Sequence, residues 1–266
     1  MKDKFLSILK SSRLDLTDLI VCADMGTELD KSVFDLCPKD FLRWAKIDLK
    51  GGNLMGHINS LTNSKRAIDC QIDSVFEALG IKSDNFNKEF ADYVKLFDFE
   101  DDNIPIKLKI IHSINLAPSL IIFKTRSLRN KLEHLYQQPK EDEVKEAVDI
   151  ADLFIRCVDG KTDMINSEFF ITDGKNFGKS RWHVEKNLYF KFDTDLKNFS
   201  IKIKNTTSDD SNLEEVIIDS NDKEFIAILN LMFSINDDFD CEDAIVKLLQ
   251  FAGHKIPSEQ VNAQIG

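Results

Sequence analysis

The sequence predicts an α+β protein, in which an N-terminal all-helical bundle is followed by a small α+β domain with an antiparallel sheet. Two observations carry this prediction. Up to about residue 160 the apolar residues recur at intervals of three and four, as they do on amphipathic helices. Beyond that point the interval shifts towards two, which is typical of half-buried strands. We therefore expect a helical domain at residues 1–160 and an α+β domain at residues 161–266.

Composition supports a folded protein and limits its partners. The chain has 266 residues, of which 42% are hydrophobic, and this is enough for one or two packed domains. Its 46 acidic side chains outnumber its 35 basic ones, and the formal charge of −11 disfavours general binding to polyanions. The first residues lack a signal-peptide core, and no apolar stretch is long enough to span a membrane. We expect a cytoplasmic protein without a membrane partner.

Glycine and proline mark the ends of the helices expected in the first domain. Gly80 lies where a C-cap glycine ends a long apolar stripe, Pro118 is tolerated in a first helical turn, and Gly160 is expected to stop the last helix. Cys37-Pro38 is interpreted as a turn. The expected helices cover residues 2–11, 14–23, 59–79, 86–98, 118–136 and 140–158.

Alternation predicts the strands of the second domain. Phe199, Ile201 and Ile203 alternate with polar residues, as on a strand with one buried face. The expected strands cover residues 168–172, 182–193, 197–204 and 215–219, and two closing helices are expected at 222–235 and 241–252. Gly253 is the expected cap of the last helix.

Common motifs for cofactors and metals do not occur in the chain. The five cysteines and five histidines are scattered, without a C-x-x-C pair or an H-E-x-x-H helix. Neither a phosphate-binding G-x-x-x-x-G-K-[ST] loop, nor a dinucleotide-binding G-x-G-x-x-G turn, nor a G-x-S-x-G nucleophile elbow is present. We expect no cofactor and no metal.

One expected helix carries an ordered set of reactive side chains, spaced as R-x4-H-x-Y. Arg129 is followed by His134 five residues later and by Tyr136 two residues after that. At 100° per residue, Asn130 and His134 share one helix face, whereas Arg129 and Tyr136 lie on another roughly 140° away. Arginine and histidine can therefore act on one ligand only if the helix lines a cleft that wraps around it.

This string resembles the active helix of HEPN domains, helical bundles found in many prokaryotic ribonuclease toxins and defence proteins. The resemblance extends from about Phe41 to Val158 and leaves residues 161–266 unexplained. It implies a metal-independent endoribonuclease site at a homodimer interface, made here by Arg129, Asn130 and His134. An interface between two copies would also bring the two helix faces to one phosphate.

The chemistry of these residue types fits RNA cleavage through the ribose 2′-OH. His134 has a suitable pKa for proton transfer near neutral pH, and Arg129 can hold the phosphorane oxygens. Around them the basic side chains are expected to bind RNA phosphates: Lys124, Arg126 and Lys131. In the toxin branch paired with nucleotidyltransferase antitoxins, the tyrosine of the string receives AMP. The resemblance therefore implies nucleotidylation at Tyr136 and a toxin–antitoxin or phage-defence role.

Simpler interpretations of the same residues stay open. Arg129 and Glu133 form an i,i+4 ion pair on any exposed helix, His134 suits a helix C-terminus, and Tyr136 suits a packed core. The bundle could also serve as a non-catalytic dimerisation module that binds a nucleotide or a protein.

The second domain offers two weaker alternatives. Its strands are rich in lysine, which indicates either a solvated face or a platform for RNA, with three rings available for stacking on bases: Trp182, His183 and Tyr189. An enzyme site near the strand ends is the other alternative, and its candidate residues are Asp173, Lys175 and His183.

Overall fold

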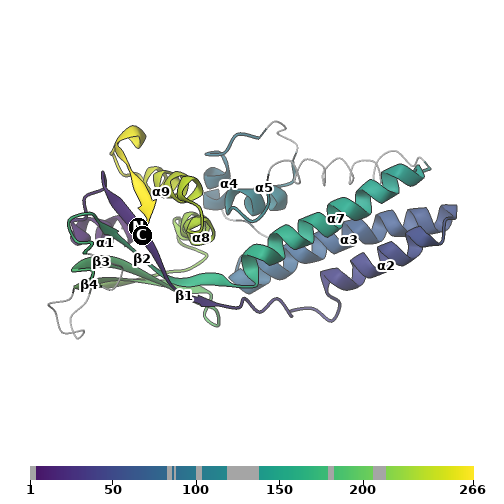
Figure 1. Ribbon diagram of the computed structural model, residues 1–266, viewed down its shortest axis with the longest axis horizontal. Helices are drawn as coiled ribbons and strands as arrows, with labels where there is room; N and C mark the ends of the chain where they lie inside the picture. Colours follow the sequence, from purple (N-terminus) through teal and green to yellow (C-terminus); the bar gives the residue numbers. More distant parts are fainter. Residues whose placement is uncertain are drawn as a thin grey trace. The chain divides into compact units, whose positions relative to one another are not determined.

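Figure 1 shows the computed structural model of the protein, in which the chain divides into two compact units. The structure describes residues 4–82, 86, 88–99, 104–118, 138–178, 183–205 and 214–266. A sheet unit comprises Met1–Leu29, Asn87–Leu96 and Met164–Gly266, and a helical unit comprises Asp30–Phe86 and Phe97–Asp163. The chain therefore passes between the two units four times.

In the described part of the sheet unit, six strands form one mixed sheet with the order β5-β4-β3-β2-β1-β6. Neighbours are antiparallel except β1 and β6, which run parallel. The strands are β1 (Leu19–Thr27), β2 (Ile165–Asp173), β3 (Lys186–Asp193), β4 (Asn198–Asn205), β5 (Glu215–Ile218) and β6 (Ala263–Ile265).

Phenylalanine rings join the sheet to two helices, α1 (Lys4–Ser12) and α8 (Phe225–Ser234). Phe190 on β3 is fully buried and stacks on Phe169 of β2, with ring centroids 4.7 Å apart. Phe5 of α1 lies 6.4 Å from Phe190, and Phe225 of α8 lies 5.7 Å from Phe199 on β4. Because strand residues two apart share a face, the register of β3 and β4 places these strand rings together. Both helices therefore cover the same face of the sheet.

A third helix, α4 (Lys88–Val94), is anchored in the sheet unit through a buried tyrosine. The Asn230 amide of α8 donates a hydrogen bond of 2.9 Å to the hydroxyl of Tyr93. The Tyr93 ring also packs edge-on against Phe251 of α9 (Asp238–Ala252), with centroids 5.1 Å apart. Burial raises the pKa of Tyr93, so this hydroxyl stays protonated. Tyr93 thus anchors the ten-residue segment Asn87–Leu96, which lies between two segments of the helical unit in the sequence, to the core of the sheet unit.

The helical unit is built on α2 (Pro38–Lys50), α3 (Leu54–Leu79) and α7 (Glu141–Thr162), which Figure 1 shows as extended, neighbouring helices. The hydroxyl of Ser60 on α3 donates 2.8 Å to the carbonyl of Ala45, so α2 and α3 pack closely where these small residues meet. Leu61 of α3 packs against Ala147 of α7. A shorter helix, α5 (Ile106–Ser113), belongs to the same unit.

Helix α3 follows the sequence signals that predict it. The Asn53 side chain caps its first turn by accepting a hydrogen bond from the amide of Gly56. Gly80 ends it in the left-handed conformation, with φ of 76°, which a residue without a Cβ adopts at low cost. The expected glycine cap is therefore confirmed, as is Gly253 after α9, which has φ of 82°.

The predicted fold class is wrong, because helices and strands are interleaved along the chain as a mixed α/β fold. The sheet begins with β1, whose first residues, Leu19 to Ala23, were expected to lie in the helix 14–23. Leu19 to Cys22 are all buried, and β1 lies between β2 and β6. A strand covered on both faces is apolar throughout, and its short run cannot be distinguished from a buried helix by periodicity.

Three further expectations are also corrected. Pro38, interpreted as part of a turn, instead begins α2, because proline in a first turn has the required φ and lacks only an amide that needs no partner. Helix α7 continues through Gly160 to Thr162. The sheet is mixed rather than antiparallel because β6 adds in parallel to β1.

None of the described helices is both long and apolar enough to cross a lipid bilayer.

Candidate functional site

The residues expected to react with RNA lie in the segment 119–137, outside the described residues. The described chain stops at Pro118, shortly after α5, and resumes at Gln138, shortly before α7. The predicted residues of this segment are Lys124, Arg126, Arg129, Asn130, Lys131, His134 and Tyr136. Their roles stay predictions.

The described part of the helical unit has an open hollow on the surface of α2, lined by residues of that helix alone, which we call the α2 groove. Its volume is about 270 Å³. Two aliphatic side chains and four cations line it: Lys39, Leu42, Arg43, Lys46, Ile47 and Lys50. The cations recur at intervals of four, three and four, which places them on one side of a helix. This surface was missed by the sequence reasoning because α2 was not expected, although the spacing of the cations is readable once the helix is known.

Ion pairs fix two of these cations against α7. The ammonium of Lys39 lies 2.8 Å from Asp159, and that of Lys46 lies 3.1 Å from Asp152. Lys39 and Lys46 are seven residues apart on α2, and Asp152 and Asp159 are seven apart on α7. The same contact therefore recurs after about two helical turns. Arg43 instead pairs with Asp40 of its own helix at 3.0 Å and keeps 66% of its side chain exposed.

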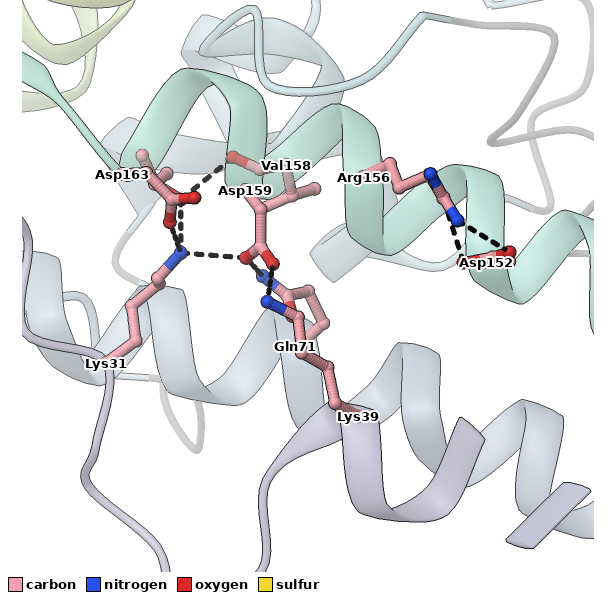
Figure 2. Close-up of polar contacts among 9 residues, drawn as sticks. Lys31, Lys39, Gln71, Asp152, Arg156, Val158, Asp159 and Asp163 are labelled. Atoms are coloured by element: carbon pink, nitrogen blue, oxygen red, sulfur yellow. Dashed lines mark hydrogen bonds and ion pairs between the residues drawn. The ribbon is translucent and has the colours of Figure 1, made fainter. Parts of the chain in front are cut away.

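Each of the two α7 aspartates is shared by two cations. Figure 2 shows Asp159 between Lys31 and Lys39, and Asp152 beside Arg156. Asp159 also accepts hydrogen bonds from Lys31 at 2.7 Å and from the Gln71 amide at 3.1 Å. Asp152 accepts a second bond, from Arg156, at 3.0 Å. Each carboxylate is thus contacted by two positive charges, and Lys31 also pairs with Asp163 at 2.8 Å.

Charge around the α2 groove is positive, in contrast to the chain as a whole. The six cations are Lys31, Lys39, Arg43, Lys46, Lys50 and Arg156, and the four paired carboxylates are Asp40, Asp152, Asp159 and Asp163. Asp48 lies on the same helix beside Ile47, so six cations against five carboxylates give a net formal charge of +1 in a protein of net charge −11. An anion is therefore favoured at this face over the rest of the surface.

Partial burial and the neighbouring lysines act on Asp159 in opposite directions. Burial alone acts to raise the pKa of Asp159, but the hydrogen bonds from Lys31 and Lys39 outweigh it, and the pKa is lowered overall. The same contact with Asp159 raises the pKa of Lys39. Both groups are therefore charged at neutral pH.

Acid is expected to destabilise the helical unit through Asp159. Because the folded pKa is lowered, the stabilisation by this carboxylate is complete above its ordinary pKa of 3.8. It is lost as the pH falls through the folded value. We expect Asp159→Asn to lower the free energy of unfolding by an amount that is constant from about pH 7 to about pH 5 and shrinks below about pH 4.

The measurement is urea unfolding followed by the fluorescence of Trp44 on α2, in a Trp182→Phe background that leaves Trp44 as the sole tryptophan. Asp163→Asn is the matched control, because the Asp163 side chain is 66% exposed and has one lysine partner in the described structure. A difference between wild type and Asp159→Asn that persists unchanged at about pH 2 would contradict the expectation.

The lysine-rich strands of the sheet unit are matched by carboxylates on the same face. The Tyr189 hydroxyl lies 2.8 Å from Asp24 and also contacts Glu168, and Lys191 pairs with Glu168 at 2.8 Å. Lys204 lies 3.0 Å from the centroid of the Tyr189 ring. Burial and the two carboxylates raise the pKa of Tyr189, so its hydroxyl is not a base at neutral pH. The solvated, charge-balanced interpretation of these lysines fits this geometry better than an RNA platform.

Asp173 and Lys175, two of the candidates for an enzyme site near the strand ends, are engaged in contacts within the protein. The Asp173 carboxylate is buried and accepts hydrogen bonds from the backbone amides of Asp15 and Asn176, at 2.8 and 3.0 Å. Lys175 pairs with Asp15 at 2.8 Å, which lowers the pKa of that carboxyl to about 2. These contacts hold a loop at the end of β2, which is a structural role.

Groups of three or more side chains suited to metal binding do not occur among the described residues. Comparison of the chain with models of protein families, with curated proteins and with solved structures finds no match. Functional inference therefore depends on the R-x4-H-x-Y string and on the α2 groove.

Proposed function

We propose that the protein is a metal-independent endoribonuclease, with its reacting groups in the helical unit. The observation that carries the proposal is the string Arg129, Asn130, His134 and Tyr136 in the stretch of the helical unit between α5 and α7. These residue types supply what cleavage by the ribose 2′-OH requires without a metal: a group that transfers protons near neutral pH and a fixed cation for the phosphorane oxygens.

The organisation of the helical unit supports this proposal. The HEPN resemblance covers about residues 41–158, and the helical unit covers Asp30–Phe86 and Phe97–Asp163. The resemblance therefore concerns a helical unit whose chain is inserted between β1 and β2, rather than an N-terminal bundle. The insertion leaves α7 directly after the reactive string in the sequence.

Assembly and control form part of the same proposal. Two copies related by a twofold axis place Arg129 of one and His134 of the other at a single phosphate. Tyr136 is the acceptor of AMP from a nucleotidyltransferase antitoxin, and the added phosphate brings negative charge beside the cations that hold RNA. In this role the protein acts in the cytoplasm as a toxin or a phage-defence effector.

A second candidate function, a non-catalytic binding module, is favoured by the α2 groove. The groove offers four cations and two aliphatic side chains, and such a set can hold a ligand without transferring a proton. Binding and cleavage must therefore be measured separately.

The test is incubation of the purified full chain with end-labelled single-stranded RNA in EDTA. We expect cleavage products that end in a 2′,3′-cyclic phosphate, because the 2′-OH is the nucleophile. A 2′-deoxy substrate of the same sequence is the control, since it lacks the nucleophile and should stay intact. Cleavage of both substrates, or of neither, contradicts the proposal, and RNA binding without cleavage selects the second candidate.

A further inference from the structure

We propose that the α2 groove is a binding site for the backbone of single-stranded RNA, with Arg43 and Lys50 as phosphate ligands. The choice of RNA as the occupant rests on the proposed function. All the residues that form the groove are described in the structure. They include four cations along α2, two of which pair with α7 aspartates that are each shared by two cations.

Length and charge of the groove suit a strand of several nucleotides. Lys39 and Lys50 are eleven residues apart, which corresponds to about 16 Å along a helix. At roughly 3.4 Å per nucleotide in a stacked strand, that distance covers about five phosphates. The local net charge of +1 attracts them, whereas the overall charge of −11 opposes the approach of a long duplex.

The ion pairs with α7 prepare the groove for this ligand. Lys39 and Lys46 are held in place by Asp159 and Asp152, so less side-chain entropy is lost when a phosphate binds beside them. Arg43 has no partner on α7 in the described structure, and its guanidinium can form the bidentate contact that phosphate favours. The paired lysines stay exposed, Lys39 at 70% and Lys46 at 45% of the side chain, so both can also face the ligand, as Arg43 can.

Aliphatic surface within the groove distinguishes a nucleotide strand from a simple anion. Ile47 lies between the cations in sequence and is 60% exposed, while Leu42 is buried at the base of the helix face. A ribose or a base edge can cover Ile47 while its phosphate meets Arg43 or Lys50. A surface that alternates cations with apolar contacts is typical of sites that follow a single strand.

The experiment measures binding of a fluorescein-labelled oligouridine by anisotropy, with the full chain in EDTA and in a His134→Ala background that keeps the RNA intact. Arg43→Ala with Lys50→Ala removes two cations that form no pair with α7 in the described structure. The matched control is Lys88→Ala with Lys95→Ala, because Lys95 pairs with Asp92 at i,i+3 as Arg43 does with Asp40. Circular dichroism checks that all variants are folded.

We expect the groove variant to bind about tenfold more weakly or worse, and the control to bind within about twofold of the parent. The slope of log K against log salt should fall in magnitude by about 1.4, which corresponds to two phosphate contacts on a single strand. Arg43→Lys with Lys50→Arg should retain the slope of the parent.

Equal binding by the groove variant and its parent overturns the proposal, as does an equal loss in the control. Binding of polyglutamate in place of RNA also overturns it. Failure of the proposed function is a separate result. If the wild type cleaves no RNA but the groove variant still binds RNA more weakly than its parent, the groove remains an RNA-binding site. If the wild type cleaves RNA and the groove variant binds it as tightly as its parent, the proposed function stands and the proposal for the groove fails.

Discussion

RNA cleavage is expected to fall by about 10²–10⁴-fold in His134→Ala, which is the usual contribution of a positioned acid–base group. The imidazole is the only side chain of the string whose ordinary pKa allows it to accept and return a proton near neutral pH. With alanine at this position, only water is left to accept the proton of the 2′-OH, so cleavage is slower. The measurement is the single-turnover rate of the wild type and the variant on labelled RNA in EDTA.

Two companion variants make this result specific. Arg129→Ala should lower the rate as strongly, and Arg129→Lys should restore only part of it, because an ammonium keeps the charge but loses the bidentate contact. His254→Ala is the control, since His254 lies in the sheet unit and belongs to none of the candidate sites. Wild-type rates in both His134→Ala and Arg129→Ala would show that the string is not the reacting site.

Tyr93→Ala is expected to lower the free energy of unfolding of the sheet unit by about 3–5 kcal/mol, as for other large aromatic side chains truncated in a core. Tyr93 is fully buried, and its loss removes the contact with Phe251 and the acceptor for Asn230. The measurement is urea unfolding by circular dichroism. Trypsin should also cut faster after Lys88, which begins α4, and after Lys95, which follows it, because the helix is no longer anchored.

Tyr93→Phe separates packing from the hydrogen bond. It keeps the ring and should cost about 1–3 kcal/mol, because it leaves the buried Asn230 amide without this acceptor. Equal stability of the wild type, the phenylalanine variant and the alanine variant would mean that α4 does not depend on Tyr93 for its position.

Elements with strong local signals could be predicted from the sequence. The structure confirms helices close to those expected at 222–235 and 241–252, where α8 spans Phe225–Ser234 and α9 spans Asp238–Ala252. Capping glycines and helical periodicity act within a few residues, so they are visible without tertiary context. The strand expected at 197–204 is likewise found as β4.

Features that depend on distant residues could not be predicted in this way. Strand β1 forms because Leu19 pairs with Asp173 on one side and with Ala263 on the other. Neither partner is visible in a local window, and strand preference depends on such neighbours. The α2 groove was not predicted because the helix that forms it, α2, was not predicted. The R-x4-H-x-Y string needs no structure to be recognised, but its side chains lie outside the described residues and stay a prediction.

The position of β1 has a consequence for biosynthesis. Leu19 and its partner Asp173 are 154 residues apart, so at roughly 5–20 residues per second the ribosome needs roughly 8–30 s to make the second after the first. During that time the apolar run Leu19–Cys22 has neither neighbouring strand, while α2, α3 and α7 are synthesised. The helical unit can therefore fold on the nascent chain before the sheet closes. Until then β1 exposes two unpaired edges, which makes this segment prone to non-native pairing with other chains.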